Sequence, residues 1–359
     1  MTVNASINLT FTAGTAAAWF TPYVSGGPGY GVGVGYGISL GNDASVTLNG
    51  TATAPCQYVQ FHTVQECTTN WMNGWLSGVA GGTVKDYNNP SVLTANFTHF
   101  SEMAADSDHF RDGPSGESLL VRASNCEILG QFGGYNLLGT YTNCLFDRVA
   151  FWQGTGDTNP YVIFRNITFH GGSVGFTHWE APMYGDAPPY WYSSARNCAF
   201  DGTTFAIDDP FGVNTNYADY NYNAFLAGVT QMSPEGTNNV VVTNSFNWQV
   251  SWLGSYYLTN SNALVDKGDR TADQLGLYHF TMLASQIKET NSVVDIGYHY
   301  VATDMNGNPL DYDGDGIPDY LEDANGNGVV DNGETSWTNY NSGNGLTSGN
   351  GLMVFTPLK

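Results

Sequence analysis

Basic residues are scarce in this chain. Its 359 residues include ten Lys and Arg against 32 Asp and Glu, which gives a formal net charge of −22. Binding to nucleic acid requires clusters of Lys and Arg that neutralise phosphates. The composition therefore argues against a nucleic-acid partner and favours cations as ionic partners.

Long apolar segments are also missing. No run of 18 or more apolar residues occurs, so the sequence predicts no membrane-spanning helix. The first residues, MTVNASINLT, lack a basic region followed by an apolar core, so no signal peptide is visible in them. We expect Met1 to be the start of a fragment rather than a natural N-terminus.

Glycine and aromatic residues, in contrast, are abundant. The chain has 44 Gly, 22 Tyr, 19 Phe and 9 Trp. Aromatic residues favour strands and Gly favours turns, whereas neither favours long helices. The composition therefore predicts an all-β protein.

A degenerate repeat runs through the middle of the chain. Its copies are SNCEIL, TNCLFD, RNITFH, RNCAFD and TNSFNW, with the shared Asn at Asn125, Asn143, Asn166, Asn197 and Asn244. A period of about 20 to 25 residues with short apolar runs indicates a β-solenoid whose turns each add short parallel strands. Asn tolerates a left-handed backbone, so we expect these residues at corners of the coil.

The cysteines support the same register. Cys126, Cys144 and Cys198 each follow a repeat Asn, which predicts a stacked ladder of small buried side chains rather than a metal site, since no CxxC motif accompanies them. Cys56 and Cys67 remain. They either form a local disulfide, consistent with an oxidising compartment, or stay unpaired.

Two further segments, SNALVDKGDR (261–270) and VVDIGYHY (293–300), add to the Asn-punctuated turns. Together these features resemble the right-handed parallel β-helix proteins of the pectate-lyase-like superfamily, with Tyr298 where Ala is common. The resemblance implies a secreted β-helix over residues 38–300. It does not fix an activity, because the superfamily includes lyases, hydrolases, epimerases, adhesins and inert modules.

Four regions follow from this interpretation. We expect an N-terminal cap and Gly-rich segment at 1–37, the parallel β-helix at 38–300, tandem calcium-binding loops at 301–335, and a linker and tail at 336–359.

The calcium prediction rests on two consecutive twelve-residue loops, DYDGDGIPDYLE and DANGNGVVDNGE. Alternate side chains of such a loop point inward, Gly permits the bend at position 6, and the last Glu closes the site. The expected ligands are Asp311, Asp313, Asp315, Ile317, Asp319 and Glu322 in the first loop, and Asp323, Asn325, Asn327, Val329, Asp331 and Glu334 in the second. The abutting loops are similar to thrombospondin type 3 or dockerin-like calcium repeats, and DMNGNPLD (304–311) adds a partial third.

Aromatic residues of one long loop are candidates for glycan contact, because sugar rings stack on aromatic faces. They are Trp179, Tyr184, Tyr190, Trp191 and Tyr192. They could equally pack the loop onto the solenoid or contact another protein.

The functional prediction is a secreted or cell-surface module, stabilised by calcium at its C-terminal segment. Adhesion, extracellular structure and glycan binding are the expected roles, with polysaccharide or cell-envelope components as partners and end-to-end self-association through exposed strands. The alternative is a secreted polysaccharide lyase or glycoside hydrolase that acts in the β-helix groove. Its candidate groups are the arginines Arg122, Arg148, Arg165 and Arg196 and the pair Asp208 and Asp209. Non-catalytic roles are favoured for all of these, so the sequence favours the module and keeps the enzyme as the alternative.

Overall fold

The computed structural model describes residues 2–3, 6–19, 35–60, 76–81, 90–102, 107–111, 119–130, 132–134, 138–155, 161–178, 192–208, 218–229, 236–340 and 342. The chain divides into two compact units. Unit 1 comprises Met1–Phe246 with Ile296–Tyr298, and unit 2 comprises Asn247–Asp295 with His299–Lys359.

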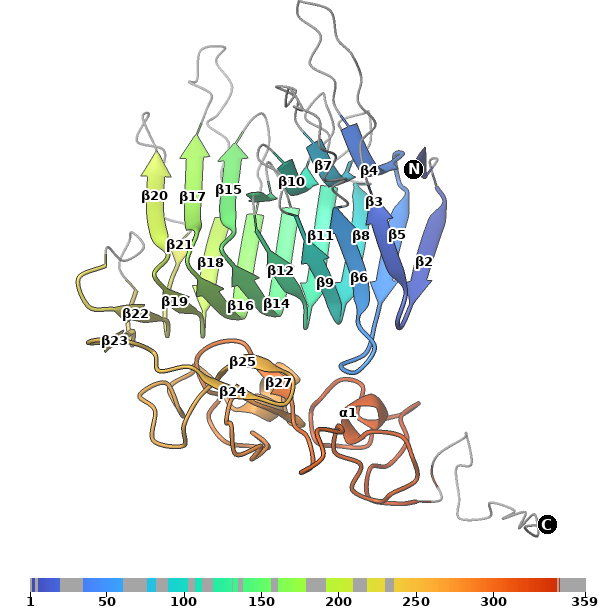
Figure 1. The fold of residues 1–359 in the computed structure, drawn as a ribbon, viewed down its shortest axis with the longest axis vertical. Coiled ribbons are helices and arrows are strands. Elements are labelled where there is room, and N and C mark those ends of the chain that lie inside the picture. Colours follow the sequence, from blue (N-terminus) through green and yellow to red (C-terminus); the bar gives the residue numbers. More distant parts are fainter. Residues whose placement is uncertain are drawn as a thin grey trace, which may run out of the picture. The chain divides into compact units, whose positions relative to one another are not determined.

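Unit 1 contains two parallel sheets (Figure 1). The first sheet consists, in spatial order, of β1 (Thr2–Val3), β4 (Gly35–Leu40), β7 (Leu76–Ala80), β10 (Ser107–Arg111), β13 (Phe132–Gly134), β15 (Ala150–Thr155), β17 (Ser173–His178) and β20 (Thr204–Asp208). The second sheet consists of β2 (Asn8–Thr12), β3 (Ala16–Trp19), β5 (Ser45–Asn49), β6 (Cys56–Gln60), β8 (Ser91–Asn96), β9 (Thr98–Ser101), β11 (Leu119–Ser124), β12 (Glu127–Leu129), β14 (Leu138–Asp147), β16 (Tyr161–His170), β18 (Tyr192–Arg196), β19 (Ala199–Asp201), β21 (Ala218–Asp219), β22 (Ala224–Leu226) and β23 (Val240–Val242).

The chain visits these sheets in a repeating order. Each coil from β1 to β22 adds a strand to the first sheet and then one or two strands to the second sheet, as in β7, β8 and β9. The strand pairs between successive coils are parallel. Parallel strands need a crossover connection, and here the rest of the coil supplies it. The predicted all-β parallel solenoid is therefore confirmed at this level.

Asparagines occupy the corners of the second sheet, as predicted. Asn125, Asn143, Asn166 and Asn197 have φ values of 54°, 49°, 56° and 56°, in the left-handed region that Asn tolerates. The side chains of Asn125 and Asn143 also bond along the stack. Asn143 Nδ2 donates to Asn125 Oδ1 at 2.8 Å, and Asn125 Nδ2 donates to Asn96 Oδ1 at 2.9 Å.

The fifth Asn of the repeat does not follow this pattern. Asn244 lies beyond β23, is exposed, and does not have a left-handed backbone. The next corners are instead Tyr222 and Asn238, both with φ of 59°, which the pairing of Ala224 with Val240 aligns. Sequence spacing misplaced this corner because the last coil is shorter than the preceding coils.

The residue after each corner forms the predicted cysteine ladder. Cys126, Cys144 and Cys198 are fully buried, and their Sγ atoms lie 3.1 Å, 3.3 Å and 3.2 Å from the carbonyl oxygen two residues earlier. Strand register places Cys56 and Thr98 in the same column. Burial raises the pKa of the Cys144 thiol well above its ordinary value, which fits a packing role rather than a reactive one.

Aromatic rings stack through the interior of the same sheet. Phe146 and Phe169 have ring centroids 4.9 Å apart, Phe169 and Phe200 5.0 Å, and Phe200 and Phe225 5.1 Å. These distances follow the spacing of neighbouring strands, about 4.8 Å. In the four coils from Phe146 to Phe225, one Phe therefore packs on the equivalent Phe of the next coil.

The limits of the solenoid differ from the predicted limits at both ends. Described residues of segment 1–37 form the first coil, since β1, β2 and β3 pair with β4, β5 and β6. At the other end, the last parallel strand is β23, and Asn247–Asp295 lies in unit 2. Residues 259–270, which carry half of the closing pattern, form turns rather than a strand. The other half contributes Ile296–Tyr298 to unit 1, where the Tyr298 N–H donates to Thr168 Oγ1 at 2.9 Å.

Unit 2 has little regular structure. Its elements are the antiparallel pairs β24 (Gln249–Ser251) with β25 (Gly254–Tyr257) and β26 (Phe280–Thr281) with β27 (Tyr300–Val301), the 3-10 helix η2 (Ala272–Leu275) and the helical turn α1 (Asp319–Glu322). Elsewhere in unit 2, backbone groups form hydrogen bonds within turns or with polar side chains.

Candidate metal centre

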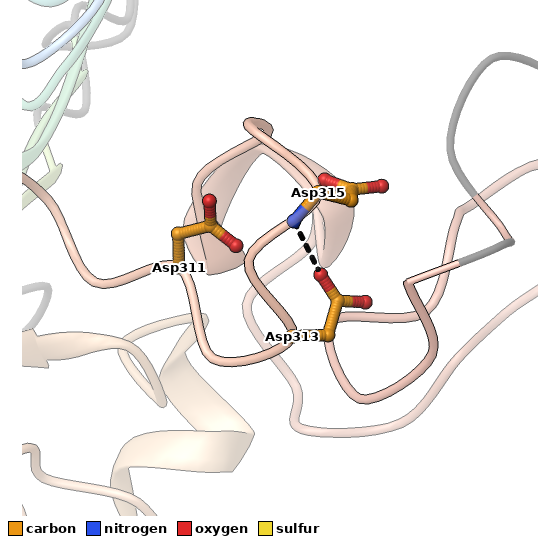
Figure 2. Close-up of side chains that lie close together, drawn as sticks. All are labelled: Asp311, Asp313 and Asp315. Atoms are coloured by element: carbon orange, nitrogen blue, oxygen red, sulfur yellow. Dashed lines mark hydrogen bonds between the residues drawn. The ribbon is translucent and has the colours of Figure 1, made fainter. Parts of the chain in front are cut away.

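Three aspartates of the first predicted loop converge. One carboxylate oxygen from each of Asp311, Asp313 and Asp315 lies within 4.8 Å of the others, and all three side chains are half-buried (Figure 2). Carboxylate oxygens at alternate loop positions are the ligands that Ca²⁺ prefers. The structure thus brings together the residues predicted at positions 1, 3 and 5.

Hydrogen bonds within the loop fix its shape. Asp311 accepts the N–H groups of Gly314 at 2.8 Å and Gly316 at 3.0 Å, and Asp313 Oδ1 accepts the Asp315 N–H at 3.1 Å. The backbone φ of Gly316 is 95°, a value that a side chain at position 6 would strain. Ile317 donates its N–H to Asp315 Oδ1 at 2.8 Å. The backbone is therefore already bent as a cation-binding loop requires.

Glu322, at position 12, lies at the end of α1 and is 1 % exposed. Neither of its carboxylate oxygens makes a hydrogen bond of normal geometry to a described residue. Burial, with the charges of Asp315, Asp313 and Asp319, raises the pKa of Glu322 to about 7, although a nearby Thr335 hydroxyl acts to lower it. A buried carboxylate without a partner is costly unless a cation neutralises it.

The same repulsion acts on Asp313. Burial raises its pKa, and the charges of Asp315, Asp311 and Asp319 add to the shift. Its Oδ2 atom has no hydrogen bond partner among the described residues. Asp313 and Glu322 therefore both hold unpaired oxygens near the same group of negative charges.

Asp319, at position 9, is held differently. It is 1 % exposed, its Oδ1 accepts the Tyr312 N–H at 2.7 Å, and its Oδ2 accepts Lys288 Nζ at 3.2 Å. Position 9 often reaches the cation through a water molecule, so a side chain with other partners suits it.

The second loop is closed by its own hydrogen bonds. Asp323 accepts the N–H groups of Asn327 at 3.1 Å and Gly328 at 2.7 Å, and Val329 donates its N–H to Asn327 Oδ1 at 2.7 Å. The Nδ2 atoms of Asn325 and Asn327 both donate to Asp331 Oδ2, at 2.7 Å and 2.8 Å. Glu334 accepts the N–H groups of Asn325 at 3.2 Å and Asp331 at 2.9 Å. The predicted ligand residues are close together, with fewer carboxylates than in the first loop.

Two basic residues that the sequence analysis did not single out contact the loops, Lys288 the first loop and His279 the second. His279 Nε2 lies 3.0 Å from Asp323 Oδ2, and Lys288 Nζ lies 3.2 Å from Asp319 Oδ2. Spacing could not have found them, because they precede their partners by 44 and 31 residues. No local motif marks either residue.

Most of the predicted glycan-binding residues lie outside the described residues, namely Trp179, Tyr184, Tyr190 and Trp191. Tyr192 begins β18 and is 36 % exposed. Cys67 also lies outside the described residues. Cys56 is buried, and its Sγ lies 3.3 Å from the Thr12 carbonyl oxygen. Glycan contact and the Cys56–Cys67 disulfide therefore stay predictions.

Three of the four arginines considered for catalysis have other partners. Arg196 pairs with Asp219 at 2.8 Å, and Arg165 donates to the Phe164 carbonyl oxygen and to Ser194 Oγ, both at 2.8 Å. Arg148 is largely exposed and lies 3.3 Å from Asp147. Asp208 ends β20, and Asp209 lies outside the described residues.

Comparisons with known proteins identify no family. No family model matches the chain, and no curated protein matches it. One solved structure with some similarity is that of trypsin-treated QnrB1, a plasmid-mediated fluoroquinolone resistance protein, at 8 % identity over 67 % of this chain and 92 % of that chain, with a TM-score of 0.17. A likeness this low carries no argument, so the fold rests on the strand pairing itself. Among the described residues, no helix has the length and apolarity to cross a membrane.

Proposed function

We propose that this chain is a secreted or cell-surface β-helix module whose C-terminal segment binds two calcium ions. The first ion is held by Asp311, Asp313, Asp315 and Glu322, with Asp319 behind them and the Ile317 carbonyl completing the set. The second is held by Asp323, Asn325, Asn327, Asp331 and Glu334 with the Val329 carbonyl. The β-helix is of the right-handed kind found in the pectate-lyase-like superfamily.

One observation carries the calcium proposal. Oxygens of Asp311, Asp313 and Asp315 converge within 4.8 Å in a loop bent by its own hydrogen bonds, and the buried Glu322 carboxylate has no hydrogen bond partner of normal geometry among the described residues. A hard cation with oxygen ligands offsets both the mutual repulsion and the burial of these charges. Calcium suits a loop of this length better than Mg²⁺, which demands a near-ideal octahedron and retains its water.

The module's role follows from its architecture rather than from a catalytic group. A regular solenoid offers long, uniform outer faces for polysaccharide or cell-envelope components, and its edge strands offer sites for end-to-end association. Calcium then makes the C-terminal segment, which carries the two loops, more rigid. We therefore place the chain among adhesion, extracellular-structure or glycan-binding modules.

Isothermal titration of the full chain with CaCl₂ tests the calcium proposal. We expect two calcium ions per unmodified chain. The variant in which Asn replaces Asp313 and Asp315 should bind one ion, and so should Glu334→Gln. Asp43→Asn is a matched control, since it removes an exposed carboxylate of unit 1 at a backbone φ of 55° that Asn tolerates. Heat release that is equal for Ca²⁺ and Mg²⁺, or unchanged in the loop variants, would contradict the assignment.

A further inference from the structure

A chain of four side chains connects the two loops inside unit 2. Asp319 of the first loop accepts Lys288 Nζ at 3.2 Å, and Lys288 Nζ lies 3.4 Å from His279 Nδ1. The other ring nitrogen, His279 Nε2, lies 3.0 Å from Asp323 Oδ2 of the second loop. If Nε2 donates to the Asp323 carboxylate, Nδ1 of a neutral ring accepts from the ammonium group, so every hydrogen bond has one donor and one acceptor.

The two aspartates also share one turn of helix. The Asp323 N–H donates to the Asp319 carbonyl oxygen at 3.0 Å, so positions 319 and 323 lie on the same face of α1. The turn from Asp319 to Asp323 belongs to both loops. It contains positions 9 and 12 of the first loop, Asp319 and Glu322, and position 1 of the second loop, Asp323. Neither loop can be ordered without ordering this turn.

The two ends of the link and its histidine are shielded from water, whereas the Lys288 side chain is 21 % exposed. His279, Asp319 and Asp323 are each 1 % exposed, and the Trp337 ring lies 5.1 Å from His279 in an edge-to-face arrangement. Hydrogen bonds and charge pairs are stronger in such surroundings than at the surface. The link therefore gives the two aspartates a continuous set of polar contacts.

Backbone contacts fix the second loop to the same part of unit 2. The Tyr278 N–H donates to the Gly326 carbonyl oxygen at 3.0 Å. Gly328 lies so close to the Tyr278 ring that a Cβ at Gly328 would approach it within 2.4 Å. His279 therefore comes from a segment that is itself part of the second loop's support.

We propose that Lys288 and His279 act as positioning residues that couple the two loops, so that calcium ions bind to them cooperatively. This inference rests on the proposed calcium binding. The first ion fixes α1 through Glu322, and the Lys288–His279 link holds Asp323 in the position that the second ion requires. The cost of ordering the turn is then met once for two ions, which produces positive cooperativity.

Native mass spectrometry during a calcium titration tests the coupling, because it counts chains with zero, one and two ions. In the unmodified chain the one-ion species should stay below the share expected for independent sites, with the first ion raising affinity for the second at least about five-fold. Lys288→Met keeps the aliphatic stem and removes the ammonium group, and it should raise the one-ion species to the independent share. Lys267→Met is the matched control, since Lys267 is an exposed lysine of the same unit.

A mutant cycle separates coupling from simple charge loss. Replacing Asp313 and Asp315 by Asn should weaken the remaining site at least about five-fold in the native background, and leave it unchanged in the Lys288→Met background. Lys288→Arg retains a cationic donor to Asp319, so it should restore the roughly five-fold weakening of the remaining site. Such a result would show that the lost coupling in Lys288→Met does not come from misfolding. Two ions bound with the same cooperativity in Lys288→Met and Lys267→Met would overturn this inference alone. No calcium bound by the unmodified chain would overturn the proposed function as well.

Discussion

The two units bury different kinds of side chain. Unit 1 fills its interior with stacked apolar residues, and its buried acids and histidines, among the described residues, are Glu102 and His109, whose Oε2 and Nδ1 atoms lie 3.6 Å apart. Unit 2 is smaller yet buries seven such groups among its described residues. They are His279, Glu289, Asp295, His299, Asp319, Glu322 and Asp323.

The difference follows from how each unit satisfies its backbone. In the solenoid each coil bonds to the next through a strand ladder, so the interior needs only side chains that fill space. Unit 2 has short strands and many turns, and carboxylates accept backbone N–H groups that no ladder can reach, as Asp295 does for Asp266 at 2.8 Å. Buried charges then need partners or cations. We therefore expect unit 1 to respond to loss of volume and unit 2 to respond to cations and pH.

Calcium removal should have the largest effect and should act on unit 2. A ligand at one hundred times its dissociation constant stabilises the folded state by about 2.7 kcal/mol for each site. Chelation should therefore speed amide exchange of peptides from 304–340 by roughly a hundred-fold or more. Hydrogen–deuterium exchange with and without EDTA measures this, with peptides from β14 and β16 as the internal control. Equal acceleration in both units would remove the distinction.

Phe200→Ala should have the largest effect on unit 1. The ring is fully buried between Phe169 and Phe225, and its removal leaves a cavity in the stack. Core Phe→Ala changes cost about 3 to 5 kcal/mol. Exchange of unit 1 peptides and urea unfolding measure the loss, and Phe200→Leu, which fills more of the space, should lose less than half as much. Reduced calcium affinity in Phe200→Ala would show that the units are not independent.

Asp295 should make unit 2 sensitive to pH. Burial and, to a smaller extent, the charge of Glu289 together raise the pKa of Asp295 to about 8. Because the folded state retains a proton that the unfolded chain releases near its ordinary pKa, this group's contribution to stability is full at low pH and is lost as pH rises toward 8. The slope for one proton is at most about 1.4 kcal/mol per pH unit.

Glu289 does not oppose this effect between pH 5 and 8, because a lowered carboxyl pKa changes stability only below the ordinary Glu range. Burial acts to raise its pKa, but the hydrogen bond and charge of His299, 3.2 Å away, outweigh burial, and the pKa is lowered. Asp295→Asn should therefore flatten the fall in stability of unit 2 between pH 5 and 8 without reversing it. Chemical denaturation across this range measures the change, with Asp43→Asn as the control. An unchanged pH profile would mean that Asp295 is already ionised in the folded chain.

The corners and the loops show what the sequence could predict. Asn125, Asn143, Asn166 and Asn197 were predictable because one residue type meets one local backbone demand. The convergence of Asp311, Asp313 and Asp315 was predictable because alternate residues of one tight loop lie close together. Both signals depend on short-range geometry alone.

Tertiary packing set what could not be predicted. The sequence predicts a solenoid that extends to residue 300, because segments 261–270 and 293–300 resemble closing coils, whereas the last parallel strand ends at Val242. Lys288 and His279 carry no local signature, because their roles depend on partners 31 and 44 residues away. Long-range pairing of polar side chains leaves no period in the sequence.

Cys144→Thr should have the smallest effect on the free energy of unfolding. It tests the contrast between the two units, since it changes a buried polar atom within the apolar interior of unit 1. Its column already accepts Thr98, whose Oγ1 donates to the Asn96 carbonyl oxygen at 3.2 Å, and Ile167, which has no side-chain donor. A β-branched residue therefore fits, and we expect a change within about 1 kcal/mol in urea unfolding. Cys144→Val, the isostere without a hydroxyl, should be slightly less stable than Cys144→Thr. The gap should be small, because the Thr142 carbonyl oxygen also accepts the Asn125 N–H at 3.1 Å. A loss of several kcal/mol in both variants would mean that the thiols are not interchangeable space-fillers, and that unit 1 too depends on specific polar contacts.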